Sequence, residues 1–442
     1  MGSFNRIIIV TAVLYSIISF AVFHNVYNTV HTVIDEEFHI PQGMAYCNFN
    51  FSVWNHKITT LPGLYIVSTI LLGPLHLCST YWLRFVNYLG GVINMCLFVI
   101  LFGAFNEKIN NREKLSALLS AFNLSILPPL FFFTNLYYTD VVSVMFILLL
   151  LIFNKTDKHV LASACGLLSV IMRQTNIIWV GMLLVDYTVK QLYWFCRSKP
   201  ISRRETGTVR SFEVKEKDVA AFQIDDVWKL RNFKRIPKQI VINICSYVSV
   251  ILLFVIFLVV NEGIVLGDKS AHITVIHVPQ LFYFSMFCIV FAWPHFLYFM
   301  IPFLKYVKKT GILYVLSAIA IMVIIVRINT LVHPYLLADN RHYTFYIWKR
   351  FYENIPLFRY IVIPIYLFGI YSLVSSVYSR NDITFAFAYF PCTIFVLILQ
   401  KMIEIRYFLI PFLIFRLRVR QPLMTTLLTE SLTYLLMNIV TL

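Results

Sequence analysis

Three consecutive acids follow the first apolar stretch of the chain, and they are the residues best suited to proton chemistry. The segment reads Asp35-Glu36-Glu37-Phe38-His39, and Lys57-Ile58-Thr59-Thr60 lies about twenty residues further on. A carboxylate can remove a proton from an acceptor hydroxyl, with cations nearby to stabilise the charge on a departing phosphate. The pattern favours group transfer from a phosphate carrier, and the alternative is a solvated interfacial loop whose acids only face water.

Four further polar clusters interrupt the apolar sequence and offer the cations that such a reaction needs. They are Arg173-Gln174-Thr175-Asn176, Gly267-Asp268-Lys269-Ser270 with His272 and His277, the stretch 333–343 with Asp339, Asn340, Arg341, His342 and Tyr343, and Gln400-Lys401 with Glu404, Arg406 and Tyr407. Arg173 and Arg327 lie at or near the ends of apolar runs, where a charge is costly and therefore often functional, and the alternative for Arg327 is snorkelling to the interface. The alternative for the last two clusters is a structural ion pair.

The composition places these residues in a membrane protein. Apolar residues make up 59% of the 442 residues and charged residues only 13%, whereas a soluble domain has about 25% charged residues. The formal net charge of +16 comes from short basic tracts between apolar runs. This arrangement argues against a nucleic-acid partner and favours membrane lipid and phosphate-bearing substrates. We therefore predict an all-α polytopic membrane protein.

The apolar runs predict 12 to 14 transmembrane helices in one multi-span domain, residues 1–442. A retained first span over 7–23 leads into a polar first loop, residues 24–82, whose part 64–78 is re-entrant, interfacial or a further span. Later spans are predicted at 84–105, 115–133, 140–153, 159–171, 176–196, 239–260, 279–304, 311–331, 356–378, 383–399, 407–416 and 421–441.

The distribution of basic residues predicts the orientation. Residues 190–238 hold 13 bases against six acids, so the loop 197–238 is predicted to be cytosolic. Counting spans from that loop places Asp35 and the four polar clusters together on the opposite face. Cys47 and Cys78 lie in the first loop and are expected to pair if it faces the oxidising lumen.

Several soluble enzyme classes are excluded by their missing motifs. The chain has no glycine-rich strand-to-helix turn or DxD clamp in a suitable context, and no HExxH or GxSxG. Two classes besides a transferase remain open. Kinked spans and intramembrane arginines also suit a transporter or lipid scramblase, and the long basic loop suits a membrane adaptor.

Several segments also resemble a known family, the dolichyl-phosphate-glucose-dependent α-1,2-glucosyltransferases of the endoplasmic reticulum. They are 35–42, Tyr46-Cys47, Trp54, 57–65, 173–176, 336–346, and Gln400-Lys401 with Glu404, Arg406, Tyr407 and Phe408. The sequence departs from the family pattern at Asn55-His56, where an Asp-Pro pair is expected, and at Gly43-Met44-Ala45.

The resemblance implies a GT-C glycosyltransferase fold in the endoplasmic reticulum membrane, with the active site facing the lumen. The implied donor is β-linked dolichyl-phosphate glucose, and the implied acceptor is the oligosaccharide Glc2Man9GlcNAc2 on dolichyl pyrophosphate. The step would be the last glucosylation before N-glycosylation, with inversion and without a metal or cofactor. Asp35 is the preferred base and Glu36 the alternative. Predicted substrate contacts are His39, Lys57, Thr59, Arg173, Gln174, Asn340, Arg341, His342, Tyr343, Lys401, Glu404 and Arg406.

Deleting residues 198–235 distinguishes the transferase hypothesis from the adaptor hypothesis. A transferase whose chemistry lies on the opposite face should keep most of its turnover, because the deletion removes no predicted site residue. An adaptor that works through the basic loop loses its function. Glucosyl transfer by the purified deletion variant, compared with the full chain, checks this prediction.

Overall fold

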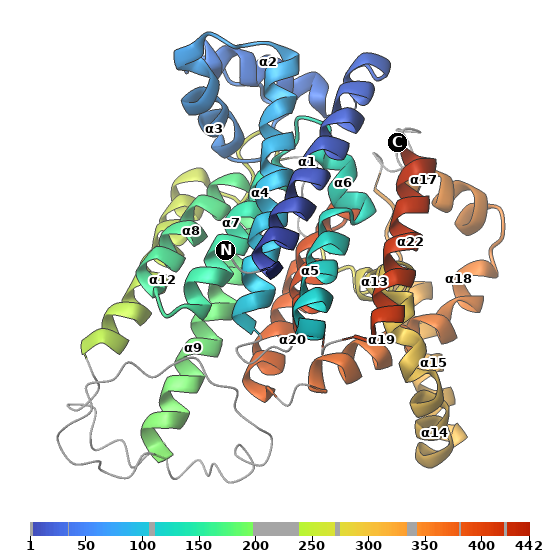
Figure 1. Cartoon of the computed structure of the whole chain (residues 1–442). Helices are drawn as coiled ribbons and strands as arrows, with labels where there is room; N and C mark the ends of the chain where they lie inside the picture. Colours follow the sequence, from blue (N-terminus) through green and yellow to red (C-terminus); the bar gives the residue numbers. More distant parts are fainter. Residues whose placement is uncertain are drawn as a thin grey trace, which may run out of the picture.

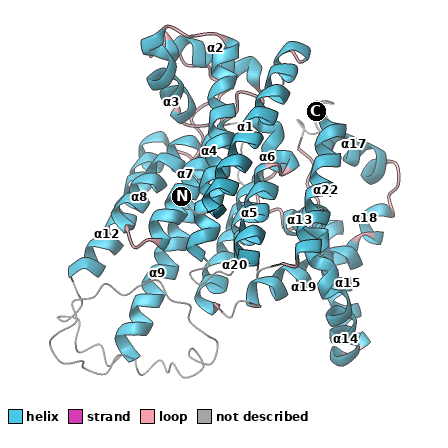
Figure 2. Cartoon of the chain, in the orientation of Figure 1, coloured by secondary structure: helices cyan, strands magenta, loops and turns pink. Residues whose placement is uncertain are grey.

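The computed structural model describes residues 3–33, 35–105, 111–197, 238–269, 275–333, 343–379, 382–419 and 422–442. Within these ranges the chain is built from helices and loops, and no strand occurs (Figure 2). The N-terminal helices are α1 (Ser3–Thr29), α2 (Glu36–Cys47), α3 (Gly63–Leu72), α4 (Thr80–Phe105), α5 (Asn111–Ser125), α6 (Pro128–Thr134), α7 (Thr139–Lys155), α8 (His159–Met172) and α9 (Ile177–Arg197).

The second half of the chain continues in the same way. Its helices are α12 (Lys238–Asn261), α13 (Pro279–Phe296), α14 (Met300–Thr310), α15 (Ile312–Asn329), α17 (Tyr343–Ile347), α18 (Phe358–Ile361), α19 (Ile363–Tyr378), α20 (Ile383–Ile398), α21 (Ile405–Arg418) and α22 (Met424–Thr441). Short 3-10 turns join some of them, at Gly73–Leu75, Gln174–Asn176 and Leu297–Phe299, and a π-helical turn spans Trp348–Glu353.

Six helical segments of the described chain are long and apolar enough to cross a membrane. They are Arg6–Thr29, Thr80–Ala104, Lys238–Asn261, Pro279–Thr310, Ile312–Asn329 and Phe358–Tyr378, and the pair α5 and α6, bent by 60°, makes a possible seventh. The prediction of an all-α polytopic membrane protein is confirmed. The sequence predicts 12 to 14 spans, more than the six or seven helical segments that are long enough. The prediction also counts shorter helices such as α7, with 17 residues, and α8, with 14.

Proline explains where one of these spans breaks. Pro128 and Pro129 open α6 after an extended residue, Leu127. A proline fits the first turn of a helix because its missing N–H would have no partner there, but it cannot continue the preceding helix. The chain therefore bends between α5 and α6 within one apolar stretch.

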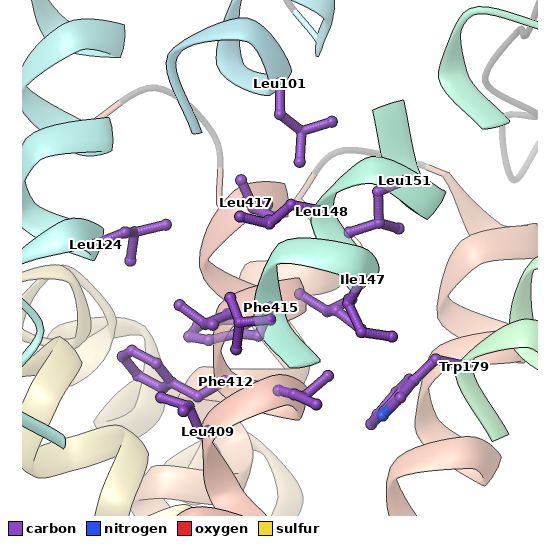
Figure 3. Packing of buried hydrophobic residues seen from close by; sticks show 14 of the residues in the cluster. Leu101, Leu124, Ile147, Leu148, Leu151, Trp179, Leu409, Phe412, Phe415 and Leu417 are labelled. Carbon is purple, nitrogen blue, oxygen red and sulfur yellow. The ribbon is translucent and has the colours of Figure 1, made fainter. Parts of the chain in front are cut away.

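The core of the bundle surrounds α21. Every residue of α21 from Phe408 to Arg418 is buried, which is unusual for a helix unless other helices surround it. Leu148 and Leu151 of α7, Trp179 of α9, and Phe415 and Leu417 of α21 belong to one buried cluster (Figure 3). The helix that begins beside Glu404 and Arg406 is thus held firmly in place.

The first loop forms a small folded unit at one end of the bundle. Helices α2 and α3 pack on each other around Ile40, Tyr46, Leu64 and Tyr65, and Cys47 and Cys78 form the expected disulfide. In Figure 1 this unit lies at the top, whereas α9 ends at the bottom and α14 lies there too. The last turn of α14 is basic, so this basic turn and the unit that carries the acidic segment lie at opposite ends of the bundle.

A buried ion pair ties the last two helices together. Both carboxylate oxygens of Glu430 accept hydrogen bonds from Arg416, at 2.8 to 3.0 Å. Asn123 of α5 donates to the same carboxylate at 2.9 Å, and His295 Nε2 lies 3.1 Å from it. A carboxylate with this many partners can stay ionised inside the bundle.

Replacing Glu430 by alanine should lower the free energy of unfolding by about 3–5 kcal/mol, because Arg416 is left as an unpaired buried charge. The double variant Arg416→Met with Glu430→Leu should recover much of that loss. Thermal unfolding of the purified protein in detergent measures both, with exposed Glu353→Gln as the control. A single variant as stable as the control contradicts the prediction.

Candidate active site

Glu36 is a structural carboxylate that lies inside the protein. Its side chain is 0% exposed, and Arg84 of α4 donates to both of its oxygens, at 2.9 Å from Nε and 2.7 Å from Nη2. The backbone N–H groups of Tyr137 and Val33 donate to the same oxygens at 2.7 and 3.1 Å. All the acceptor positions that a carboxylate offers are therefore occupied by the fold.

Asp35, one residue earlier, is in a different environment. Its side chain is 33% exposed, and one oxygen lies 3.0 Å from Nη2 of Arg406. Asp35 stands at the N-cap position of α2, but its carboxylate makes no capping hydrogen bond. The carboxylate is thus held beside a cation without being used by the helix, and it is open to solvent.

Arg406 lies between two carboxylates at the start of α21. Glu404 accepts from its Nε and Nη2, both at 2.7 Å. The guanidinium also lies over the ring of Tyr138, 5.5 Å from its centroid. Arginine stacks on aromatic faces in this way, so the ring and the two carboxylates together fix the position of the guanidinium.

Tyr138 also binds the segment that carries Asp35. Its hydroxyl accepts a hydrogen bond from the Asp35 N–H at 3.2 Å and donates to the Val33 carbonyl at 3.0 Å. The side chain of Asn87, on α4, donates to the carbonyls of Leu136 and Tyr138 at 2.6 and 2.7 Å. Helix α4 therefore anchors both Glu36 and Tyr138.

Arg173 is the second cation of the site. It stands in extended conformation between α8 and the following 3-10 turn, and its guanidinium pairs with the buried carboxylate of Asp140 in the first turn of α7. It also lies over the ring of Tyr407, 5.6 Å from the centroid. Arg173, Arg406 and Tyr407 line one small pocket, together with Gln400.

His39 lies behind the acidic segment and is uncharged. Its Nδ1 makes a 2.5 Å hydrogen bond with the hydroxyl of Tyr65. Burial lowers the pKa of His39 to about 4, although Asp35 acts in the opposite direction. A neutral buried histidine is a packing and hydrogen-bonding residue at neutral pH rather than a cation for phosphate.

The remaining predicted contacts are distributed around this centre. The Gln174 side chain donates to the carbonyl of Thr59 at 2.8 Å and so ties the first loop to the end of α8. Lys57 is exposed, with its ammonium 4.9 Å from the ring centroid of Phe38. Lys401 is half-buried. Asn340, Arg341 and His342 lie outside the described residues, as does the side chain of Tyr343.

The structure adds residues that the sequence analysis did not select. Asp140, Tyr138 and Arg84 all take part in the site or its support. A weak signal existed for two of them, because Asp140 and Arg84 are single charges at the first residue of a predicted span. Nothing in the local sequence distinguishes Tyr138 from Tyr137 beside it.

The low pKa of His39 predicts how stability depends on pH. The unfolded chain binds a proton at His39 below about 6.5, whereas the folded chain does so only below about 4. Between these values the unfolded state binds more protons, so the free energy of unfolding falls as the pH is lowered from 6.5 to 4. The loss should reach roughly 3 kcal/mol, since one pKa unit corresponds to about 1.4 kcal/mol.

Replacing His39 by glutamine should remove this part of the pH dependence and keep a hydrogen-bonding group opposite Tyr65. Thermal unfolding at several pH values, with the exposed His31→Gln as the control, measures the effect. An unchanged slope in His39→Gln would show that another group titrates.

Comparison with known proteins gives matches to one family. The model of the DIE2/ALG10 family matches residues 29–417. A Drosophila melanogaster protein named Dol-P-Glc:Glc(2)Man(9)GlcNAc(2)-PP-Dol alpha-1,2-glucosyltransferase is 40% identical over 434 residues, covering 95% of this chain and 90% of the relative. A human protein of the same name is 34% identical over 435 residues, covering 92% and 88%.

An Arabidopsis thaliana protein of that name is 30% identical over 437 residues, which cover 87% of this chain and 85% of the relative. No solved structure matches the chain, so the GT-C fold implied by the resemblance stays a prediction. The matches span most of the chain and include both ends of the site, from Asp35 to Arg406. The chain therefore belongs to the DIE2/ALG10 family.

Proposed function

We propose that the chain transfers glucose from dolichyl-phosphate glucose to the Glc2Man9GlcNAc2 oligosaccharide on dolichyl pyrophosphate, in α-1,2 linkage. The names of the relatives support this activity and give no support to the alternative, a transporter. The observation that carries the proposal is a solvent-accessible carboxylate, Asp35, held beside Arg406 with a second cation, Arg173, in the adjoining pocket.

Asp35 is the general base of this proposal, and Glu36 is not. A base must accept a new proton in the transition state. The oxygens of Glu36 already accept from Arg84 and two backbone N–H groups, and its side chain is fully buried. Asp35 is accessible and makes a single ion pair, so an acceptor hydroxyl can approach it.

Arg406 and Arg173 are the cations that stabilise the departing dolichyl phosphate. Arginine is well suited to phosphate because its planar fork binds two oxygens at once. Both guanidinium groups are already fixed by a carboxylate and an aromatic ring. Donors fixed before the reaction stabilise developing charge without a further cost of reorganisation.

The stereochemistry requires Asp35 and Arg406 to separate when the donor binds. An α-1,2 product from a β-linked donor means a single displacement, with the base and the leaving phosphate on opposite sides of the glucosyl group. In the structure the two side chains are 3.0 Å apart, which leaves no room for a sugar ring between them. Binding of the phosphate to Arg406 replaces the ion pair and leaves the Asp35 carboxylate free for the acceptor hydroxyl.

The proposed location is the endoplasmic reticulum membrane, with the site on the lumenal face. The disulfide between Cys47 and Cys78 lies in the unit that carries Asp35, and disulfides persist in oxidising compartments such as this lumen. Lys57, Lys401 and residues 340–343 remain proposed substrate contacts on the strength of the resemblance, and the reaction is proposed to use no metal or cofactor.

Replacing Asp35 by asparagine should lower kcat by about 10²- to 10⁴-fold, the usual contribution of a general base, while the yield of folded protein stays normal. Glu36→Gln should instead lower stability and yield, because it breaks a buried ion pair with Arg84. Purified variants are given dolichyl-phosphate glucose and the Glc2 acceptor, and product is quantified along with the thermal unfolding temperature.

The two variants form a matched pair, since each replaces a carboxylate by the amide of the same shape at neighbouring positions. Full transfer by Asp35→Asn would remove Asp35 as the base. A folded Glu36→Gln protein that has lost all transfer would move the assignment to Glu36. Absence of transfer by the unmodified chain would remove the proposed function itself.

A further inference from the structure

Tyr138 is the one described residue whose side chain contacts both the segment of the proposed base and the proposed phosphate-binding cation. Its hydroxyl accepts from the N–H of Asp35 at 3.2 Å, and its ring lies under the guanidinium of Arg406 at 5.5 Å. Asp35 and Arg406 are themselves 3.0 Å apart. One side chain thus contacts both the backbone that carries Asp35 and the guanidinium of Arg406.

We propose that Tyr138 is a positioning residue for glucosyl transfer: its hydroxyl fixes the peptide that carries Asp35, and its ring supports Arg406. The inference rests on the proposed function, because it assigns Tyr138 to the peptide of the proposed base and to the guanidinium of the proposed phosphate cation. Tyr138 touches neither reacting atom in this assignment and acts only through its two neighbours.

The hydroxyl closes the turn that leads into α2. It donates to the carbonyl of Val33 at 3.0 Å while accepting from Asp35, so it holds the chain on both sides of residue 34. The N–H of Val33 is bound to Glu36 in turn. The carboxylate of Asp35 takes no part in helix capping, so the hydrogen bond from the N–H of this residue to Tyr138 is a contact that holds this peptide.

The backbone around the tyrosine is held by α4 and by the residue that follows Asp35. Asn87 of α4 binds the carbonyls of Leu136 and Tyr138, and Glu36 binds the N–H of Tyr137. Burial and the nearby Asp35 raise the pKa of Tyr138 well above its ordinary value. The hydroxyl therefore stays protonated and can donate to Val33 at any pH at which the enzyme works.

The ring has a separate task from the hydroxyl. When the donor phosphate takes the place of Asp35 at Arg406, the guanidinium loses one of its two carboxylate partners and keeps Glu404. The ring of Tyr138 remains beneath it through that exchange. A cation over an aromatic face is stabilised without using any of its N–H donors, so all of them stay available for phosphate and Glu404.

Two substitutions separate the two tasks. Tyr138→Phe removes only the hydroxyl and should lower kcat by about 10- to 100-fold, as small misplacements of a catalytic group do, with the KM for the donor almost unchanged. Tyr138→Leu also removes the ring and should in addition raise the donor KM by about 2- to 30-fold, the range of a cation–π contact.

The measurements are kcat and KM for dolichyl-phosphate glucose at saturating acceptor, with thermal unfolding of each variant. Tyr247→Phe is the matched control, because it removes a hydroxyl that is bonded to Asn154 and His159 and lies outside the site. Tyr138→Trp provides a second variant, which keeps a ring under Arg406 and cannot accept from the Asp35 N–H.

The split between kcat and KM decides the outcome. A lower kcat with unchanged KM in Tyr138→Phe and Tyr138→Trp, absent in Tyr247→Phe, supports the proposal. Wild-type kcat in Tyr138→Phe overturns it. So does a loss of kcat in every variant, Tyr247→Phe included, that parallels the fall in the unfolding temperature. Transfer by the unmodified chain that is lost in Asp35→Asn establishes the proposed function separately, so failure of one inference is distinguishable from failure of the other.

Discussion

The buried ion pair between Arg84 and Glu36 is the interaction on which the site depends. Removing two charges from water is costly, and the cost is offset only where each oxygen and N–H finds a partner. Here both carboxylate oxygens receive two donors, and the remaining Arg84 groups donate to the carbonyls of Val30 and His31. The turn before α2 is therefore attached to α4 and cannot shift without exposing unpaired charge.

This attachment gives two neighbouring acids different roles. Glu36 is buried and paired with Arg84, whereas Asp35 pairs with Arg406 and stays accessible. The side chains of consecutive residues at the start of a helix point in different directions, so fixing one of them determines where the other points. The proposed base is thus placed by a neighbouring carboxylate that is bound inside the fold.

The cation opposite Asp35 is held from the other end of the sequence. Arg406 lies in the first turn of α21, a helix whose residues are all buried from Phe408 onward. The far end of α21 is fixed by Arg416 bound to Glu430 and by Arg418 paired with Asp382. A helix anchored along its length and at its end keeps Arg406 at a constant place, which suits preorganised stabilisation of a phosphate.

The sequence by itself determined the class of protein and the segments that matter. Apolar run lengths gave helix positions close to those of α4, α7, α8, α12 and α20, because a membrane requires each backbone to satisfy its own hydrogen bonds. Three consecutive acids after the first apolar run marked Asp35 as a candidate, and polar clusters between later apolar runs marked Arg173 and Arg406.

Only the tertiary structure separated Asp35 from Glu36 and revealed Tyr138 and Asp140. Adjacent acids look alike in a sequence, and their roles follow from partners such as Arg84, 48 residues away, and Tyr138, 103 residues from Asp35. Composition and periodicity report on neighbours along the chain, whereas hydrogen bonding and burial depend on which distant helices pack together. Which residues form the site, and what each of them contacts, is therefore decided by how the helices pack in the folded bundle.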